Sequence, residues 1–365
     1  MTQHRTRIGV AAVALAALAL TGCATGSATP SETESSGQIA APETLRVGIF
    51  HPDVSFAAFY AAIGEDGALT EALDEHGVEL QIEYIPSGSN LMAALNGGTV
   101  DAALVPTTAL LAVSNQGGNV APLAGIYTGA GQMVIGASEH EKDRGEDIEA
   151  YDGATWAFTR VGSIGHAVAR MVAEDAGLDW AEQTELPLGS GSEAQAVLET
   201  NRADILITSP VNAARAVQTG VGYLVANSEA DEDAPLGMAL NSVLAVNGGF
   251  EEKYPEFSQV LTTSVIDGLL ELKDITDPAE ALALMPDEFV EAVSDSWELQ
   301  WEYASAGIER VGGVFTEVEV EQGVESALIS AAVPETFELD ESLFDNKYAI
   351  AAFEELGVEV PEGAL

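Results

Sequence analysis

Residues 93–112 read AALNGGTVDAALVPTTALLA, and residues 197–216 repeat their pattern as VLETNRADILITSPVNAARA. Each stretch predicts the end of a helix, a turn, an apolar strand that opens with Asp101 or Asp204, a proline next to hydroxyl side chains, and a second helix. Strands that are apolar throughout are typical of buried parallel sheets. A chance likeness between two strand–helix units is the alternative, but the matching order predicts two lobes of similar architecture.

The surrounding sequence alternates short apolar strands with amphipathic helices. Strands are predicted over residues 45–50, 78–85, 100–105, 120–127, 132–138, 155–159, 184–187, 204–208, 221–226 and 238–247. From Pro255 onward the pattern is mainly helical, with prolines near the helix starts, where proline suits the first turn. Trp297 and Trp301 lie four positions apart on one such helix and are expected in the core. The chain therefore predicts an α/β fold with a helical C-terminal segment.

The chain begins with the features of an export signal over residues 1–22. Two arginines precede an uncharged apolar run over residues 8–20, which is too short for a bilayer span of about 20 residues. The run leads into Leu-Thr-Gly-Cys, and Cys23 is the only cysteine, so no intrachain disulfide is expected. This ending resembles the lipobox of bacterial lipoproteins, a resemblance that implies a lipid on Cys23. An ordinary signal peptide that happens to contain a cysteine is the alternative.

Residues 23–43 are small, polar and rich in Ser, Thr, Pro and Glu, which predicts a flexible tether before a folded region that starts near Thr44. The whole chain has 13 basic and 59 acidic residues and a net charge of −46. Such an acidic chain repels nucleic acids and anionic lipid surfaces, which excludes nucleic-acid binding. The acidic residues are spread along the sequence, which indicates a solvated acidic surface. No other stretch has the length of a membrane span, so we expect membrane association through the lipid alone.

Several segments in a fixed order carry a resemblance to a known family. They are LRVGIF (45–50), FAAFYAAIGEDGAL (56–69), VELQIEYIPSGSN (78–90), LMAALNGGTVDAALVPTTALLA (91–112) and LAVNGGFEEKYPEFSQVLTTSVIDGLLEL (244–272). Together they resemble the solute-binding lipoproteins of ABC importers, in the group that binds nitrate, sulfonates, taurine and thiamine-precursor pyrimidines. The resemblance covers residues 44–300, and the last 65 residues match only as generic helices.

The resemblance implies a type II periplasmic-binding fold, in which two α/β lobes are joined by two hinge strands and a solute binds in the cleft. The hinge strands are expected at residues 127–134 and 238–244. The first lobe is expected to comprise residues 44–128 and 246–365, and the second lobe residues 129–245. The implied function is that of an extracytoplasmic, lipid-anchored, monomeric receptor without a cofactor. It would capture a small organic solute by lobe closure and deliver it to a membrane permease with a cytoplasmic ATPase.

Open α/β sheets bind ligands beyond the carboxyl ends of their strands, and this rule selects candidate ligand-binding residues in both lobes. They are His51, Phe59, Tyr60, Ser87, Ser89, Asn90, Thr107 and Thr108 in the first lobe, and Arg160, Ser163, Thr208 and Ser209 in the second. The hydroxyls and backbone N–H groups of residues 87–90 precede a helix and favour an anionic group. A plain helix cap is the alternative. Phe59 and Tyr60 are expected to cover an apolar part of the ligand, with core packing as the alternative.

Arg160 is the most informative of these candidates, because only 11 basic residues remain once the leader, which holds two of the 13, is removed. It directly follows a predicted strand, and Gly162 and Ser163 then begin a helix. A guanidinium beside a helix N-terminus suits a carboxylate, sulfonate or phosphate, and a surface ion pair is the alternative. Binding that does not require Arg160 would indicate a neutral or cationic ligand.

The sequence assembles no enzyme active site, so no catalytic residue is assigned. The only cysteine lies at the end of the leader, the histidines are isolated, and the Gly-x-Ser-x-Gly pattern is absent. A metal site from His51, Asp53 and His166 is not expected. Two alternatives to a transport receptor remain. One is a thiamine-pyrimidine-type binding protein or related biosynthetic enzyme, because a relative of this fold makes that pyrimidine. The other is a sensory lipoprotein without a transport role.

Overall fold

The computed structural model describes residues 39–365 except residues 86–87, 190–192, 230–233 and 235. The predicted leader, Cys23, Ser87 and the tether up to residue 38 lie outside the described residues. None of the described helices combines the length and the apolar character that a membrane crossing requires.

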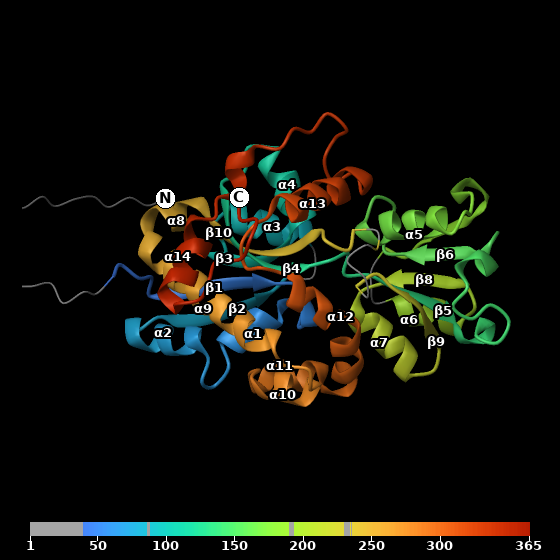
Figure 1. Ribbon diagram of the computed structural model, residues 1–365, viewed down its shortest axis with the longest axis horizontal. Helices are drawn as coiled ribbons and strands as arrows, with labels where there is room; N and C mark the ends of the chain where they lie inside the picture. The colour runs from blue at the N-terminus through green and yellow to red at the C-terminus, as the bar shows by residue number, and fades with distance from the viewer. Residues whose placement is uncertain (1–38, 86–87, 190–192, 230–233, 235) are drawn as a thin grey trace, which may run out of the picture. The chain divides into compact units, whose positions relative to one another are not determined.

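Two five-stranded sheets form the framework of residues 39–365 (Figure 1). The strands are β1 (Thr44–Ile49), β2 (Glu79–Tyr84), β3 (Ala102–Pro106), β4 (Val120–Thr128), β5 (Met133–Ala137), β6 (Thr155–Phe158), β7 (Thr184–Pro187), β8 (Ile205–Thr208), β9 (Gly222–Asn227) and β10 (Leu240–Asn247). The first sheet has the order β2-β1-β3-β10-β4, and the second has the order β7-β6-β8-β5-β9. In each sheet the first three strands are parallel and the fourth is antiparallel to both neighbours. The predicted α/β architecture with two similar lobes is confirmed.

Helices pack on both faces of each sheet, and a sheet with its helices is called a lobe below. The helices are α1 (Ala57–Ala62), α2 (Ala68–His76), α3 (Gly88–Asn96), α4 (Thr107–Ser114), α5 (Ile164–Asp175), α6 (Ala194–Glu199), α7 (Pro210–Gln218), α8 (Gly248–Lys253), α9 (Pro255–Lys273), α10 (Pro278–Ala283), α11 (Asp287–Val293), α12 (Trp297–Arg310), α13 (Glu317–Ile329) and α14 (Lys347–Leu356). In the first lobe, Val47 of β1 lies in one core with α1, α2 and α9, while Val105 of β3 lies in another with α3, α4 and α13. In the second lobe, Trp156 of β6 faces α5, and Ala157 faces α6 and α7. This alternation along the strands follows from their two-residue period.

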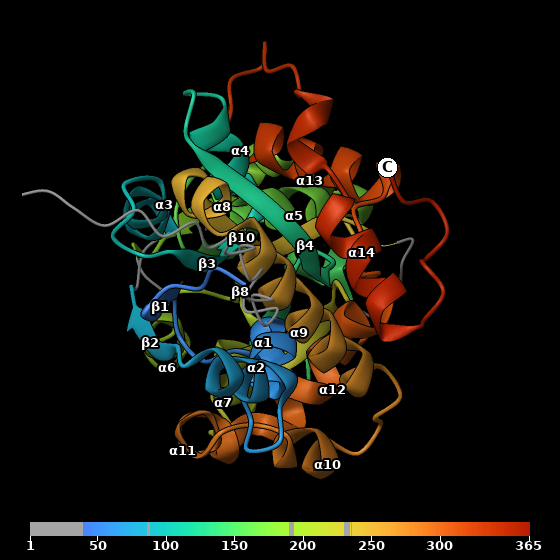
Figure 2. The ribbon, with the colours of Figure 1, turned by 90° about the vertical axis from the view of Figure 1, so that its left-hand side faces the viewer.

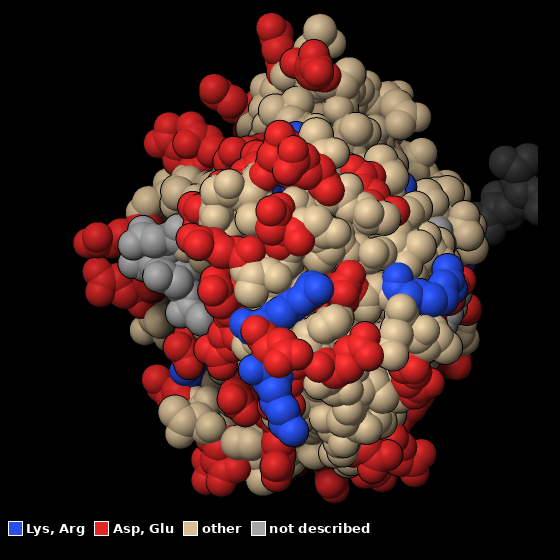
Figure 3. Space-filling model, turned by 90° about the vertical axis from the view of Figure 1, so that its right-hand side faces the viewer, with Lys and Arg blue, Asp and Glu red and all other residues tan. Residues whose placement is uncertain are grey.

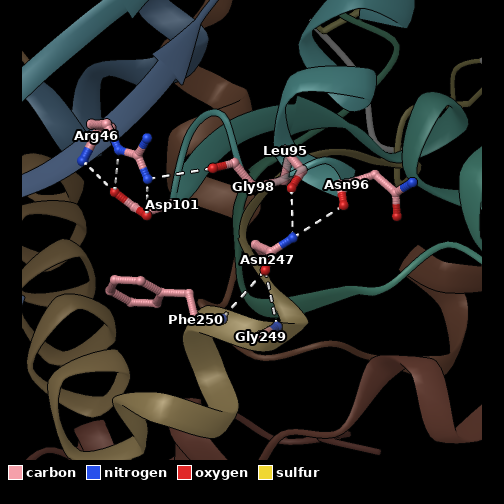
Figure 4. Close-up of polar contacts among 8 residues, drawn as sticks. All are labelled: Arg46, Leu95, Asn96, Gly98, Asp101, Asn247, Gly249 and Phe250. Atoms are coloured by element: carbon pink, nitrogen blue, oxygen red, sulfur yellow. Dashed lines mark hydrogen bonds and ion pairs between the residues drawn. The ribbon is translucent and has the colours of Figure 1, made fainter. Parts of the chain in front are cut away.

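The two aspartates of the repeated stretches make matching contacts. In the first lobe, the Asp101 carboxylate accepts hydrogen bonds from the backbone N–H of Arg46 at 3.0 Å and from its guanidinium at 2.7 and 2.9 Å (Figure 4). In the second lobe, the Asp204 carboxylate accepts a hydrogen bond from the backbone N–H of Thr155 at 2.7 Å and pairs with His140 at 2.8 Å. The repeated sequence therefore makes the same contact between adjacent parallel strands in both lobes.

Asn247, the last residue of β10, joins three elements of the first lobe (Figure 4). Its side-chain amide donates to the carbonyls of Leu95 and Asn96 at the end of α3, at 2.8 and 3.2 Å. Its side-chain oxygen accepts from the backbone N–H groups of Gly249 and Phe250, which caps the start of α8. Because each contact satisfies a backbone group at a helix end, Asn247 fixes the position of α3 and α8 relative to β10.

The chain passes from the first sheet to the second after β4 and returns between β9 and β10. The predicted boundary after residue 128 coincides with the end of β4. The predicted boundary after residue 245 falls inside β10, which pairs with β3 and β4 of the first sheet. The return crossing therefore precedes Leu240. The apolar run over residues 238–247 identifies a buried strand, but its pattern does not say which sheet the strand joins.

The C-terminal helices α12 and α13 contact both lobes, although the whole segment 246–365 is predicted to belong to the first. Helix α12 packs against β4 and also against α7, and α13 packs against α4 and β10 and also against α5. The side-chain amide of Asn227, the last residue of β9, donates to the carbonyl of Tyr303 on α12 at 3.0 Å. By contrast, α9 and α14 lie beside β4 of the first sheet (Figure 2). Trp297 and Trp301 are buried, as predicted.

Candidate ligand-binding cavity

A cavity of about 170 Å³ takes its lining from both lobes. The first lobe contributes the loop after β1, the ends of β3 and β4, the start of β10, and α13. The second lobe contributes the chain after the first crossing and the starts of α5 and α7. Pockets for drug-sized ligands have volumes of about 300–1,000 Å³, so this cavity suits a small solute.

A buried carboxylate and an imidazole form the charged corner of the cavity. Asp53 is 4% exposed, and its Oδ1 accepts hydrogen bonds from the backbone N–H and the hydroxyl of Ser55 at 3.0 and 2.9 Å. Its Oδ2 lies 3.5 Å from Nε2 of His51, whose side chain is half exposed. Burial would raise the pKa of Asp53, but the contacts with His51 and Ser55 outweigh it and lower that pKa. Burial would lower the pKa of His51, but Asp53 outweighs it and raises that pKa.

Aromatic rings line the cavity next to this pair. Phe50 and Phe56, which flank the His51–Asp53 loop, have ring centroids 6.4 Å apart. Tyr127 of β4 also lines the cavity, and its hydroxyl lies 3.2 Å from Glu229 Oε2 and 3.1 Å from the carbonyl of Ala304. These contacts hold the phenol in place, so the cavity has a rigid aromatic wall.

Neutral hydrogen-bonding groups complete the lining. Thr108 and Ser209 stand at the starts of α4 and α7, one from each lobe, and Gln132 follows the first crossing. Asn241 of β10 accepts a hydrogen bond from its neighbour's hydroxyl at 2.9 Å. Ser326 of α13 also lines the cavity, and its Oγ is buried without a hydrogen-bond partner among the described residues. These groups can hold the polar atoms of a solute.

No lysine or arginine lines the cavity in the part of the chain that the structure describes. Arg215 of α7 is near enough to lower the pKa of His51 slightly, but it is exposed and lies outside the lining. The described residues also contain no group of three or more His, Cys, Asp and Glu side chains that could hold a metal ion. The fixed charge of the lining is therefore that of Asp53, with His51 as its titratable partner.

Of the residues predicted to bind a ligand, His51, Thr108 and Ser209 come together in this lining. Thr107 and Thr208 are buried next to them in sequence, outside the lining. Ser89 and Asn90 lie in the first turn of α3, also outside it, and Ser87 lies outside the described residues.

Phe59 and Tyr60 lie in the core of the first lobe, at 0% and 1% exposure. Tyr60 packs on Phe289, with ring centroids 4.3 Å apart. All six residues of α1 are buried, because the helix lies between β1 and α9 in the same core. Helix α1 therefore turns both aromatic side chains into the lobe and away from the cavity.

Arg160 is exposed and lies outside the cavity lining. Ser163 caps α5 by accepting a hydrogen bond from the backbone N–H of His166 at 3.3 Å, and its hydroxyl donates to the Arg160 carbonyl at 2.8 Å. Local hydrogen bonds thus close the loop between β6 and α5, and the exposed Arg160 stays outside the cavity lining.

Several lining residues are absent from the sequence-based candidates. Phe50 directly precedes His51, the candidate that the strand-end rule selected in the loop after β1. Asn241 carries a signal, because Asn241 and Ser242 interrupt a mostly apolar strand. Ser326 carries none, because a serine on an amphipathic helix far along the chain looks like any surface serine.

Comparison with known proteins places the chain in a family. Residues 43–283 match the model of the NMT1-like family, and a search of curated proteins found no match for the chain. Among solved structures, the chain is similar to a Bordetella bronchiseptica protein at 15% identity and a TM-score of 0.65, covering 87% of this chain and 98% of that one. It is similar to the periplasmic aliphatic sulphonate-binding protein SsuA of Escherichia coli at 16% identity and a TM-score of 0.63, covering 85% and 100%.

A third similar structure is the periplasmic nitrate-binding protein NrtA of Synechocystis PCC 6803, at 12% identity and a TM-score of 0.62, covering 88% of this chain and 91% of that one. At these identities the likeness establishes the fold, which is that of the periplasmic binding proteins. The family match extends over more than half of the chain and agrees with the resemblance in the sequence. The chain belongs to the NMT1-like family.

Proposed function

We propose that this protein is the solute-binding component of an ABC importer and that it acts outside the cytoplasm. The observation that carries the proposal is the small cavity, because its lining comes from both lobes of a periplasmic-binding fold. A site of this kind is completed only when the lobes are together. The sulphonate-binding and nitrate-binding neighbours and the NMT1-like match support the same role.

The mechanism follows from the position of the cavity between the lobes. A solute enters while the lobes are apart and contacts the loop after β1, where His51 stands half exposed at the edge. Closure then brings Ser209 of the second lobe onto the face that holds Thr108 and Tyr127. Closing excludes water and strengthens each polar contact with the solute. The closed complex is the form delivered to a permease in the membrane.

The test of this role is a thermal-shift screen with alkanesulfonates, nitrate, pyrimidines and amino acids, because a solute that binds only the folded state raises the melting temperature. We expect at least one class to stabilise the protein in a concentration-dependent way. Absence of stabilisation by every compound would contradict a receptor role. A compound consumed during incubation would instead favour the enzyme alternative, and a solute that binds without uptake in cells would favour a sensory lipoprotein.

We further propose that a lipid on Cys23 anchors the protein to the membrane. Changing Cys23→Ala in the full chain removes the thiol to which the lipid would be attached, so the protein should move from the membrane fraction into the medium. Ser27→Ala, four positions later in the predicted tether, is the matched control and should leave the protein with the membranes. A Cys23→Ala protein that still sediments with membranes would show that the anchor is assigned wrongly.

A further inference from the structure

The charge of the cavity is unusual for a site that would bind an anion. Asp53 is the carboxylate of the lining, and no lysine or arginine lines the cavity among the described residues. Residues 86–87, 190–192, 230–233 and 235, which the structure does not describe, include no lysine or arginine either. None of them can therefore add a cation to the cavity. Arg160 is exposed outside the lining. An anion in this cavity would face Asp53 with His51 as its sole positive partner.

Asp53 is more deeply buried than its local structural role requires. Through Oδ1 it caps a short 3-10 helix, accepting hydrogen bonds from the backbone N–H and the hydroxyl of Ser55. Asp340 makes the same two contacts with Ser342, at 3.1 and 2.7 Å, at an exposed position. The capping motif therefore does not need burial. The burial of Asp53 places a carboxylate against the cavity.

The second oxygen of Asp53 is available to a ligand. Oδ2 lies 3.5 Å from Nε2 of His51, which is longer than a good charge-assisted hydrogen bond of about 2.7–2.9 Å. The rings of Phe50, Phe56 and Tyr127 line the same cavity. A carboxylate beside aromatic rings is an arrangement that can recognise cations, since a cation placed over a ring is attracted by its partial negative charge.

We propose that the cavity binds a solute that carries a cationic nitrogen, in an ammonium or amidinium group, with Asp53 as its counter-ion. The inference rests on the proposed function as a solute receptor and names the class of solute. The nitrogen donates to Oδ2 of Asp53, and the attached carbon atoms lie against Phe50, Phe56 and Tyr127. The acidic side chains spread over the molecular surface, of which Figure 3 shows one face, add a long-range attraction for a cation.

Binding of such a solute is coupled to the proton on His51. Burial and the exposed Arg215 lower the pKa of His51, but the adjacent Asp53 outweighs them and raises it. A cation on Asp53 takes over the role of the protonated imidazole, so His51 releases its proton. The affinity for a cation therefore rises as the pH increases through the pKa of His51. An anion held by protonated His51 would show the opposite dependence.

The experiment is isothermal titration calorimetry with matched propyl and benzyl series, each with an ammonium, an alcohol and a sulfonate. We expect the ammonium to bind most tightly in at least one series, and more tightly at about pH 8 than at about pH 5.5. Asp53→Asn keeps the cap on Ser55 but removes the charge, so it should weaken ammonium binding about 10- to 100-fold. Asp340→Asn removes the charge from the same motif at the surface and should leave binding unchanged.

Each outcome decides between the two proposals. Tighter binding of a sulfonate than of its ammonium, or an affinity that falls as the pH rises, overturns the cationic solute and leaves the receptor role standing. Ammonium binding that is equally strong in Asp53→Asn also overturns it. A lack of binding by all six probes overturns it as well, and the receptor role itself fails only if the broader screen of solutes is also negative.

Discussion

The two lobes repeat one backbone contact but neutralise its charge in different ways. In the first lobe, Arg46 supplies both the backbone N–H and the guanidinium that meet the Asp101 carboxylate. In the second lobe, Thr155 supplies only the N–H to Asp204. The positive charge comes instead from Arg144, at 3.5 Å, while the His140 imidazole lies 2.8 Å from the carboxylate. The two repeated stretches therefore share the contact from the aspartate to the backbone of the neighbouring strand. The side chain that neutralises the aspartate differs, because in the second lobe it comes from a distant part of the sequence.

A third carboxylate, Glu229, lies at the return crossing between the lobes, and its oxygens make no ion pair among the described residues. Its oxygens accept hydrogen bonds from the Gly131 backbone N–H at 2.5 Å and the Tyr127 hydroxyl at 3.2 Å. Arg310 donates to the backbone carbonyl of Glu229 rather than to the carboxylate. Burial raises the pKa of Glu229 to about 7, although these contacts oppose it. In the lobes, the carboxylates of Asp101 and Asp204 form ion pairs with arginines. At the return crossing, the carboxyl group of Glu229 has a pKa of about 7.

The largest change in stability is expected from substituting Glu229. Its folded pKa of about 7 exceeds the ordinary value of 4.5, so its contribution to stability is complete below the ordinary value and is lost as the pH rises through the folded one. The shift corresponds to about 3 kcal/mol, at about 1.36 kcal/mol per unit. Glu229→Gln should therefore gain stability relative to the wild type between about pH 4.5 and about pH 7. Urea unfolding of both proteins across this range measures the difference, and a constant difference would contradict the assignment.

The next largest change in the free energy of unfolding is expected at the two aspartates of the repeated stretches, and it should differ between them. Asp204→Ala leaves Arg144, whose side chain is only 25% exposed, without this anion and removes the 2.8 Å partner of His140, and should cost about 2–3 kcal/mol. Asp101→Ala leaves Arg46, which is 39% exposed and can turn to water, and should cost about 1–2 kcal/mol. Chemical unfolding of the two variants tests the order. Asp143→Ala, at an exposed position of the second lobe, is the control, and equal losses at Asp101 and Asp204 would contradict the comparison.

The smallest effect is expected in the size of the molecule on binding. The lobes are joined by the two crossings and by α12 and α13, so a solute between them should draw them together. Small-angle scattering with a saturating solute from the thermal-shift screen should show a small decrease in the radius of gyration. A radius that stays the same would mean that the lobes are already fixed by the C-terminal helices and that closure plays no part in capture.

The positions of the strands could be predicted, because a short apolar run bounded by polar residues is enough to specify a buried strand. Asp101 and Asp204 each stand directly before an apolar strand, and both strands, β3 and β8, form where the pattern places them. The place of β10 in the first sheet could not be predicted, since an apolar run specifies burial but not a partner strand. The partners of Asp204 were equally hidden, because His140 lies on a loop that meets β8 only through the fold.

The site was predicted less completely than the fold. The strand-end rule selects His51, Thr108 and Ser209, which lie in the cavity lining, because it follows from sheet geometry. It does not distinguish a ring that faces the ligand from one that faces the core, and Phe59 lies in the core. Ser326 could not be selected, because α13 reaches the cavity only through its packing on both lobes.

The central claim is that one solute site is built jointly by the two lobes. It is tested most directly by placing a bulky side chain in the cavity from each side in turn, with Thr108→Phe in the first lobe and Ser209→Phe in the second. Thr336→Phe and Thr184→Phe, at exposed positions outside the lining, are the matched controls. Titration calorimetry with the solute that most stabilises the wild type should show no binding to either cavity variant and normal binding to both controls. Binding at wild-type strength to Thr108→Phe or to Ser209→Phe would contradict the claim.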